Sequence, residues 1–343
     1  MIFVSGAVVI ALVLTVLFVM QMQGDVTPGT PPPATNSPYL SMSDDGTRAA
    51  VPSSASPGPS RSYEGTGARP RAVMRAETEE EILELLRLEP LSGFDVPHGP
   101  AASADPGAAS ETMRPPAKFE PKHVIGPDDG REHVADTAAF PYRAVVFIKV
   151  NGGRCSGFLY GKDIVATAGH CVHGGGSAGK WYKDAVVWPG RDDRFVPYGP
   201  CKGRKLYSVA GWVERGDERY DLGAIKLDCE IGKLTGWFGL ATESDVTGFA
   251  SEVAGYPADK GLGQWTHKDS VRQTSDLQIF YQNDTEGGMS GGPVFLDLAG
   301  CGICSMSVHA YYLHGQTPHS DHNHGVKLTP EVYNTLIAWR DAN

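Results

Sequence analysis

The stretch Gly287-Gly288-Met289-Ser290-Gly291-Gly292-Pro293 presents one serine in a glycine-rich turn. Glycine permits the sharp backbone conformations that point several N–H groups toward one spot. A serine hydroxyl is a weak nucleophile at neutral pH and needs a neighbouring base to accept its proton. This turn therefore predicts that a histidine and an acid lie close to Ser290 in the fold.

Two further segments supply these groups. Thr167-Ala168-Gly169-His170-Cys171 ends a β-type run, and Asp221 heads the alternating run Asp221-Leu222-Gly223-Ala224-Ile225-Lys226-Leu227. In a Ser-His-Asp triad the histidine accepts the serine proton and the acid orients the imidazole. A lone histidine is commonly structural, but the order histidine, aspartate and glycine-flanked serine predicts a triad of His170, Asp221 and Ser290.

The same turn also satisfies a competing pattern. Gly288-Met289-Ser290-Gly291-Gly292 matches G-x-S-x-G, the nucleophile elbow of α/β-hydrolases. That fold needs its acid and histidine after the serine and alternates its strands with long helices. Only 53 residues follow Ser290, they hold one predicted helix, and the chain before them is rich in β-type runs. The elbow interpretation is therefore disfavoured.

Short β-type runs between turn residues fill the chain after Val124, without an internal repeat of fixed period. They cover residues 144–150, 157–160, 163–166, 185–188, 222–227, 253–255, 277–281, 294–296 and 305–309. Many short strands with glycine-rich turns favour an all-β barrel or sandwich. A terminal helix is also expected, with Thr329 as its cap, Pro330 in its first turn, and Val332, Leu336 and Trp339 on one face.

From about His123 to its end, the chain resembles the trypsin-like fold, and more narrowly the secreted glutamyl endopeptidases of bacteria. The matching segments are 124–129, 139–144, 168–171, 220–225, 255–260, 284–295 and 304–309, and the resemblance covers roughly two thirds of the chain. The resemblance implies an all-β fold of two antiparallel six-stranded β-barrels with a C-terminal helix. It places His170 and Asp221 on the first barrel and Ser290 on the second, with the site in the cleft between them.

Residue by residue, the resemblance implies that His170 is the general base, Asp221 its orienting acid and Ser290 the nucleophile that forms an acyl-enzyme. The N–H groups of Gly288 and Ser290 would form the oxyanion hole. Met289 departs from the wider pattern, because other trypsin-like enzymes carry an aspartate there that pairs with the new N-terminus after activation. A zymogen switch of that kind is therefore not expected.

The resemblance also implies a substrate pocket. In glutamyl endopeptidases a histidine after the serine and a small hydroxyl residue before it line the pocket, and His309 and Thr285 occupy these places. An imidazole and a hydroxyl suit a buried substrate carboxylate, so we expect cleavage after Glu, and less well after Asp. Asp284 and Glu286 flank Thr285, and an acid pointing inward would favour basic substrates instead.

Three alternatives stay open at this point. His309 can be a structural barrel histidine, the enzyme can be a trypsin-like protease with another preference at P1 (the residue before the scissile bond), or the chain can be a non-catalytic trypsin-like binding module.

The 343-residue chain is uneven in composition, since 15 of its 25 prolines fall between Pro28 and Pro116 and all six cysteines lie beyond residue 150. Residues 1–22, with an uncharged apolar run over 2–20, are expected to be a signal peptide or a signal anchor that tethers the chain to a membrane. Residues 23–122 are expected to be a Pro/Ser/Gly-rich prosegment or linker, disordered over 21–75, and residues 123–343 the protease domain.

One stretch of the front differs from the rest. Thr78-Glu79-Glu80-Glu81 is a capping box, followed at helical spacing by Ile82, Leu85, Leu86 and Leu88. The helix is either a prosegment element that docks on the downstream domain or a marginal, solvated helix.

We expect a secreted or membrane-anchored enzyme that is made as a precursor. The mature chain should begin near His123, after Lys122, because Pro121 disfavours self-cleavage at Glu120. With 40 acidic and 30 basic residues the net charge is −10, which argues against nucleic acid as a partner. Polypeptide substrates are the expected partners of a monomer that uses no cofactor.

Six cysteines in an exported protein favour disulfides over zinc ligands. Cys155 and Cys171 bracket the strand pair that leads to His170, so a bridge there would brace the catalytic histidine. Cys201 with Cys229, and Cys301 with Cys304, are the economical remaining pairs, although six cysteines allow fifteen connectivities.

Four histidines, His314, His319, His322 and His324, crowd one loop together with Asp321. A transition-metal site, a cationic rim and a solvated polar loop all fit this pattern. We favour the solvated loop, so the sequence predicts no metal site.

Overall fold

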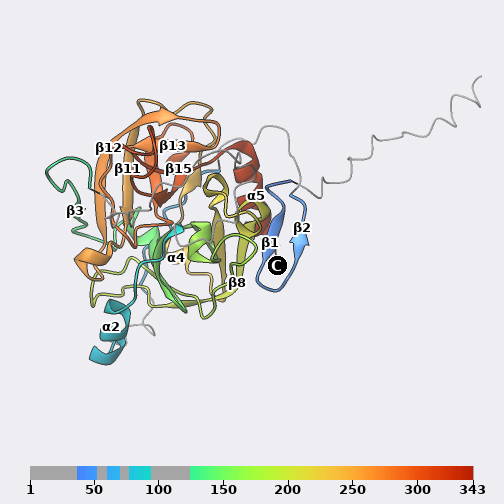
Figure 1. Ribbon diagram of the computed structural model, residues 1–343. Helices are drawn as coiled ribbons and strands as arrows, with labels where there is room; N and C mark the ends of the chain where they lie inside the picture. Colours follow the sequence, from blue (N-terminus) through green and yellow to red (C-terminus); the bar gives the residue numbers. More distant parts are fainter. Residues whose placement is uncertain (1–36, 52–59, 70–76, 94–123, 343) are drawn as a thin grey trace, which may run out of the picture. The chain divides into compact units, whose positions relative to one another are not determined.

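The computed structural model describes residues 37–51, 60–69, 77–93 and 124–342 (Figure 1). The apolar run over 2–20 and the expected cleavage point at 122–123 lie outside these residues. Among the helices within the described ranges, none has the length and hydropathy needed to cross a membrane.

Six antiparallel strands close the first barrel in the order β8-β7-β4-β5-β6-β9, because β9 pairs back onto β8. Their bounds are β4 (Val145–Val150), β5 (Gly153–Gly161), β6 (Ile164–Thr167), β7 (Val186–Pro189), β8 (Cys201–Val209) and β9 (Gly223–Leu227). The β-branched residues of β4 and β6 suit a pleated strand, and nearly all of them are buried.

The second barrel closes in the order β15-β14-β11-β12-β13-β16, with β16 pairing back onto β15. Its strands are β11 (Ala250–Gly255), β12 (Trp265–Thr274), β13 (Gln278–Tyr281), β14 (Pro293–Leu298), β15 (Gly302–Tyr311) and β16 (Asn323–Lys327). Two short strands add to it, β3 (Glu132–His133) beside β12 and β10 (Gly239–Leu240) beside β15. The predicted fold of two six-stranded antiparallel barrels is confirmed.

The helices of the described barrel region are short except the last. They are η3 (Tyr142–Ala144), η4 (Gly169–Cys171), α3 (Ala210–Val213), η5 (Glu218–Tyr220), α4 (Gly232–Thr235), η6 (Ala258–Lys260) and α5 (Pro330–Asp341). The prediction of α5 is confirmed, since the Thr329 hydroxyl accepts the Val332 N–H at 3.3 Å and Leu336 and Trp339 are buried.

The front of the chain contributes strands to the first barrel. β1 (Ser41–Ser43) pairs with β2 (Arg48–Ala49) and with residues 207–209 of β8. β1 lies beside α5, where Trp339 Nε1 donates to Ser41 Oγ at 2.7 Å (Figure 1). The predicted disordered linker is therefore wrong for residues 37–51, because backbone hydrogen bonds to a barrel strand require few apolar side chains.

A second front segment also binds the barrels through its backbone. Ser60 bridges Leu240, and Tyr63 bridges Trp237. The predicted disorder is therefore wrong for residues 60–69 as well.

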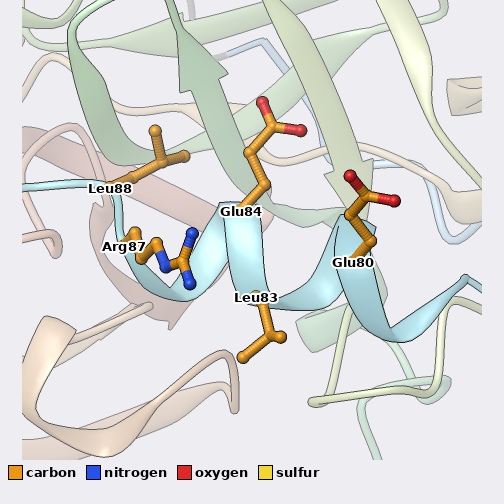
Figure 2. Close-up of a pocket in the computed structure, with 5 residues that line it drawn as sticks. All are labelled: Glu80, Leu83, Glu84, Arg87 and Leu88. Carbon is orange, nitrogen blue, oxygen red and sulfur yellow. The ribbon is translucent and has the colours of Figure 1, made fainter.

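The capping-box helix is present as α2 (Glu79–Leu86), with Thr78 Oγ accepting from Glu81 N–H and Glu81 accepting from Thr78 N–H. Ile82 and Leu85 are buried and belong to the main hydrophobic cluster of the barrels, so the docked interpretation describes this helix and the solvated one does not. On its other side a hollow is lined by Glu80, Leu83, Glu84, Arg87 and Leu88 (Figure 2).

Candidate active site

His170 and Asp221 form a buried pair on the first barrel. Asp221 Oδ2 lies 2.7 Å from His170 Nδ1, and Asp221 Oδ1 accepts the backbone N–H of His170 at 2.7 Å. His170 is 1% exposed and Asp221 is fully buried. The carboxylate therefore holds the proton on Nδ1, and in the described part of the chain Nε2 has no hydrogen-bond partner. That nitrogen has the lone pair of a general base.

The serine turn of the second barrel packs against this pair. The carbonyl of Ser290 accepts from the N–H of Ser156 at 2.8 Å, and the sulfur of Cys171, the residue after His170, lies 3.7 Å from the same carbonyl. Gly291 has a φ of +87°, and a Cβ there would lie 2.1 Å from the Ser156 carbonyl oxygen. The serine turn thus lies next to the residue that follows His170, and it requires glycine at position 291.

Two backbone N–H groups at this turn are available to a ligand. Gly288 has a φ of +98° and its carbonyl accepts from Ser156 Oγ at 2.8 Å, which fixes the orientation of its peptide. Among the described residues, the N–H groups of Gly288 and Ser290 have no acceptor. Free, convergent N–H groups are what an oxyanion hole needs.

A cavity of about 200 Å³ opens beside Ser290. From the second barrel it is lined by Glu286, Gly287, Ser290, His309, Ala310, Tyr311 and Tyr312. The structure therefore brings Ser290 and His309 to one cavity, as the sequence predicts. Thr285 is buried but does not line it, and Glu286 does.

The ring of His309 is held from behind by Tyr281. The Tyr281 hydroxyl lies 2.7 Å from His309 Nδ1, and both side chains are buried. Burial raises the pKa of Tyr281 well above its ordinary value, so the phenol keeps its proton. Tyr281 cannot be identified from the sequence, because a tyrosine at the end of an apolar run is indistinguishable from a core residue.

The carboxylates of Asp284 and Glu286, which flank Thr285, have different surroundings. The Asp284 carboxylate accepts the N–H groups of Ile125 and Gly130, each at 2.7 Å, so it holds the segment that follows residue 123. Glu286 lines the cavity and accepts the Gly287 N–H at 2.8 Å, and burial raises its pKa. The sequence alone does not predict which of these two acids faces the substrate pocket.

The chain before the barrels also reaches this cavity. Pro90, Leu91 and Ser92 line it, and Pro90 forms a parallel bridge with Arg154 on β5. Arg154 N–H donates to the Glu89 carbonyl at 2.9 Å, and Leu91 N–H donates to the Arg154 carbonyl at 3.2 Å. Residues 89–92 are thus paired with the wall of the cleft.

All six cysteines form disulfides, in the pairs Cys155–Cys171, Cys201–Cys229 and Cys301–Cys304. The first pair joins β5 to η4, the short helix that carries His170. This bond braces the histidine from the neighbouring strand.

The histidine-rich loop is not the solvated loop that we favoured. His324 is fully buried, and His314, His319 and His324 gather around Glu218. His322 bonds instead to Asp321 and to the Pro318 carbonyl. Glu218 lies 96 residues before His314 in the sequence, so no local pattern connects the two.

Comparison with known proteins places the chain in a family. The family model for trypsin matches residues 130–319. A glutamyl endopeptidase of Bacillus licheniformis is 38% identical over 232 residues, which are 66% of this chain and 72% of the relative. An extracellular metalloprotease of Bacillus subtilis is 30% identical over 298 residues, 84% of this chain and 90% of the relative.

Among solved structures, a Glu endopeptidase in complex with MPD matches with a TM-score of 0.58 and 28% identity, covering 64% of this chain and 100% of that one. Together with the two closed barrels, these matches show that the chain belongs to the trypsin family and is a serine endopeptidase.

Proposed function

We propose that the chain is a secreted endopeptidase that cleaves after Glu, and less well after Asp, through Ser290, His170 and Asp221. The observation that carries the proposal is the His309 ring in the wall of the cavity beside Ser290, with its Nδ1 held by a buried tyrosine. The B. licheniformis relative, named a glutamyl endopeptidase, supports the same substrate class.

The catalytic steps follow from the contacts of each group. His170 Nε2 accepts the Ser290 proton, and Ser290 Oγ attacks the substrate carbonyl carbon. The Gly288 and Ser290 N–H groups bind the oxygen as it becomes negative, while Asp221 stabilises the imidazolium. The imidazolium protonates the leaving amine, and water then hydrolyses the acyl-enzyme with His170 as the base.

Specificity for an acidic P1 residue follows from the chemistry of His309. With Nδ1 held by Tyr281, Nε2 is the ring nitrogen that can donate to a substrate carboxylate. Asp284 does not oppose this, because its carboxylate binds Ile125 and Gly130. Glu286 does line the cavity, so its carboxylate, when ionised, repels an acidic P1 side chain.

We also propose that the protein is a zymogen whose front occludes the cleft. Pro90, Leu91 and Ser92 lie in the cavity that a substrate must enter. Glu89 is the acid nearest to them in the sequence, and the proline after it disfavours cutting at Glu89 as at Glu120. Cutting after Lys122 would be the first step of activation.

The name of the B. subtilis relative raises metal-dependent hydrolysis as an alternative. The cavity beside Ser290 and the buried His170–Asp221 pair support the serine mechanism instead. The histidines around Glu218 lie behind Tyr311, which lines the cavity. We therefore propose the serine mechanism.

The test uses the full chain after activation by a protease that cuts at Lys122, with peptides that differ only at P1. We expect Glu to be preferred to Gln, Leu and Lys, and Ser290→Ala to lower kcat/KM by at least about 10³-fold. Tyr281→Phe removes one neutral hydrogen bond, so kcat/KM for Glu should fall by about fivefold, with little change for Leu.

Tyr333→Phe on α5 is the matched control and should leave the profile unchanged. A preference for Lys or Leu would contradict the proposed specificity, and an active Ser290→Ala variant would overturn the mechanism.

A further inference from the structure

Three histidine rings meet one carboxylate beside the cleft. His314 Nε2 lies 3.1 Å from Glu218 Oε2, and His319 Nε2 lies 3.1 Å from Glu218 Oε1. His324 Nε2 lies 4.0 Å from that same oxygen. The ring centroids are 4.7 to 5.1 Å apart, so the four side chains face one another. We call these four residues the His₃Glu cluster.

Within the described part of the chain, the buried His₃Glu cluster contains ring nitrogens without hydrogen-bond partners, which lowers the stability of the fold unless a ligand binds there. His324 is fully buried, and neither of its ring nitrogens has a hydrogen-bond partner among the described residues. A buried polar atom without a partner costs about 1–3 kcal/mol. Glu218 does not satisfy this ring, because His324 Nε2 lies 4.0 Å from the carboxylate, beyond hydrogen-bond distance. A divalent cation would bind all three rings and the carboxylate at once.

The dimensions of the cluster suit a small cation. Ligand atoms about 2.0–2.1 Å from a tetrahedral zinc ion lie about 3.3 Å from one another. The distances of 3.1, 3.1 and 4.0 Å to the Glu218 oxygens bracket that value. The ligand atoms of Glu218, His319 and His324 all lie within 4.8 Å of one another. Three ligands are thus already gathered, and a four-ligand shell needs His314, which contacts the other Glu218 oxygen, to move toward them.

We propose that Glu218, His314, His319 and His324 bind a first-row divalent metal ion, with zinc as the preferred ion. Three imidazoles and one carboxylate are ligands that zinc favours, whereas magnesium and calcium favour oxygen. Four protein ligands fill a tetrahedral shell, as in structural zinc sites.

The His₃Glu cluster joins residues of both barrels, and this position indicates what a bound ion would do. Glu218 begins η5 on the first barrel, and its carbonyl accepts the N–H of Asp221 at 3.2 Å. The histidines lie on β16 and on the connection from β15, in the second barrel. The ion would therefore cross-link the two barrels directly behind the catalytic pair. His324 also stacks on Tyr311 at 5.3 Å, so the cross-link would fix one wall of the cleft.

The test uses the full chain with Ser290→Ala, which prevents self-cleavage and makes the result independent of the proposed activity. The protein is stripped with a chelator, incubated with zinc chloride or cobalt chloride, and gel-filtered. We expect about one zinc ion per chain, a cobalt visible spectrum of the intense tetrahedral type, and a higher Tm with zinc.

Glu218→Gln and His319→Ala should each lower the retained zinc by at least about tenfold and remove the Tm increase. His322→Ala is the matched control from the same loop, because its ring bonds to Asp321 and Pro318 outside the cluster, and it should retain the zinc. Circular dichroism checks that each variant folds. If a variant does not fold, the cobalt spectrum of the Ser290→Ala chain alone tests the proposal.

Retention of less than about 0.1 zinc per chain, or an octahedral cobalt spectrum, would overturn the proposal. Equal loss of zinc in His322→Ala and His319→Ala would also overturn it. In each of those cases the cluster would be a hydrogen-bonded histidine–carboxylate network without an ion.

Discussion

At the scale of single residues, the cavity beside Ser290 contains two side chains with opposite preferences. His309 can donate to an acidic substrate, whereas an ionised Glu286 repels it. Burial raises the pKa of Glu286, so its carboxyl is neutral over a wider acidic range than an exposed glutamate. The preference for an acidic P1 residue therefore depends on the balance between these two groups.

Glu286→Gln should strengthen the preference for Glu. Where the Glu286 carboxyl is ionised, removing its charge should raise kcat/KM for Glu substrates by about fivefold, or about 1 kcal/mol. Protonation neutralises the native carboxyl as the pH falls, so the gain should be smaller at pH 5 than at pH 8. The measurement is the ratio of variant to parent kcat/KM at each pH, which cancels the pH dependence that the two proteins share.

Glu132→Gln, at an exposed position on β3, is the control and should give a ratio near one at both pH values. A Glu286→Gln gain that does not depend on pH would show that the carboxylate charge has no part in selection.

The residues that the sequence could and could not predict differ in one respect. His170, Asp221, Ser290 and His309 stand in short local patterns, so their roles can be proposed from the chain alone. Tyr281 meets His309 only because β13, β16 and β15 are neighbours in the closed barrel. Contacts of this kind depend on strand register, which the sequence does not specify locally.

At the scale of elements, the strands that the sequence predicts best are continuous runs of apolar residues. β4, β6 and β9 are near-continuous apolar runs and were predicted. β8 and β12 carry several lysine, arginine and other polar residues on exposed positions, and they were missed. Their strand conformation comes from pairing with buried neighbours, which overrides local propensity.

A buried ion pair joins the apolar contacts of Ile82 and Leu85 in holding α2 on the barrels. Arg191 is fully buried, and Glu77, just before the helix, accepts two hydrogen bonds from it at 2.8 and 2.7 Å. Removing one partner of a buried pair leaves an uncompensated charge, which typically costs about 3–5 kcal/mol. The front of the chain thus neutralises a charge that the barrels bury.

Glu77→Gln should loosen the front of the zymogen. We expect a lower Tm for the uncut full chain and a higher basal rate on a Glu peptide, because residues 88–92 follow α2 directly into the cleft. Glu79→Gln is the control, since Glu79 is 85% exposed and 3.9 Å from Arg194, and exposed pairs of this kind contribute about 0–1 kcal/mol. Equal behaviour of the two variants would show that the buried pair does not hold the front.

At the scale of the whole molecule, the predicted division at residue 122 does not separate two independent structures. β1 lies along β8, Ser60 bridges Leu240, and Ile82 and Leu85 belong to the main hydrophobic cluster of the barrels. The division at residue 122 is inferred from the distribution of prolines and cysteines along the chain. That distribution does not predict which backbone groups of a barrel strand are available to pair with the front of the chain.

These contacts have a consequence for activation. A cut after Lys122 breaks one peptide bond but none of the contacts that hold residues 37–93 on the barrels, so the front becomes a separate, bound subunit. Its inhibition then obeys mass action, because the covalent link that kept its effective concentration high is gone. Activity per mole of cut enzyme should therefore rise on dilution, and gel filtration of concentrated cut protein should show both fragments in one peak. Activity per mole that is constant over a thousandfold dilution would mean that the front leaves at once.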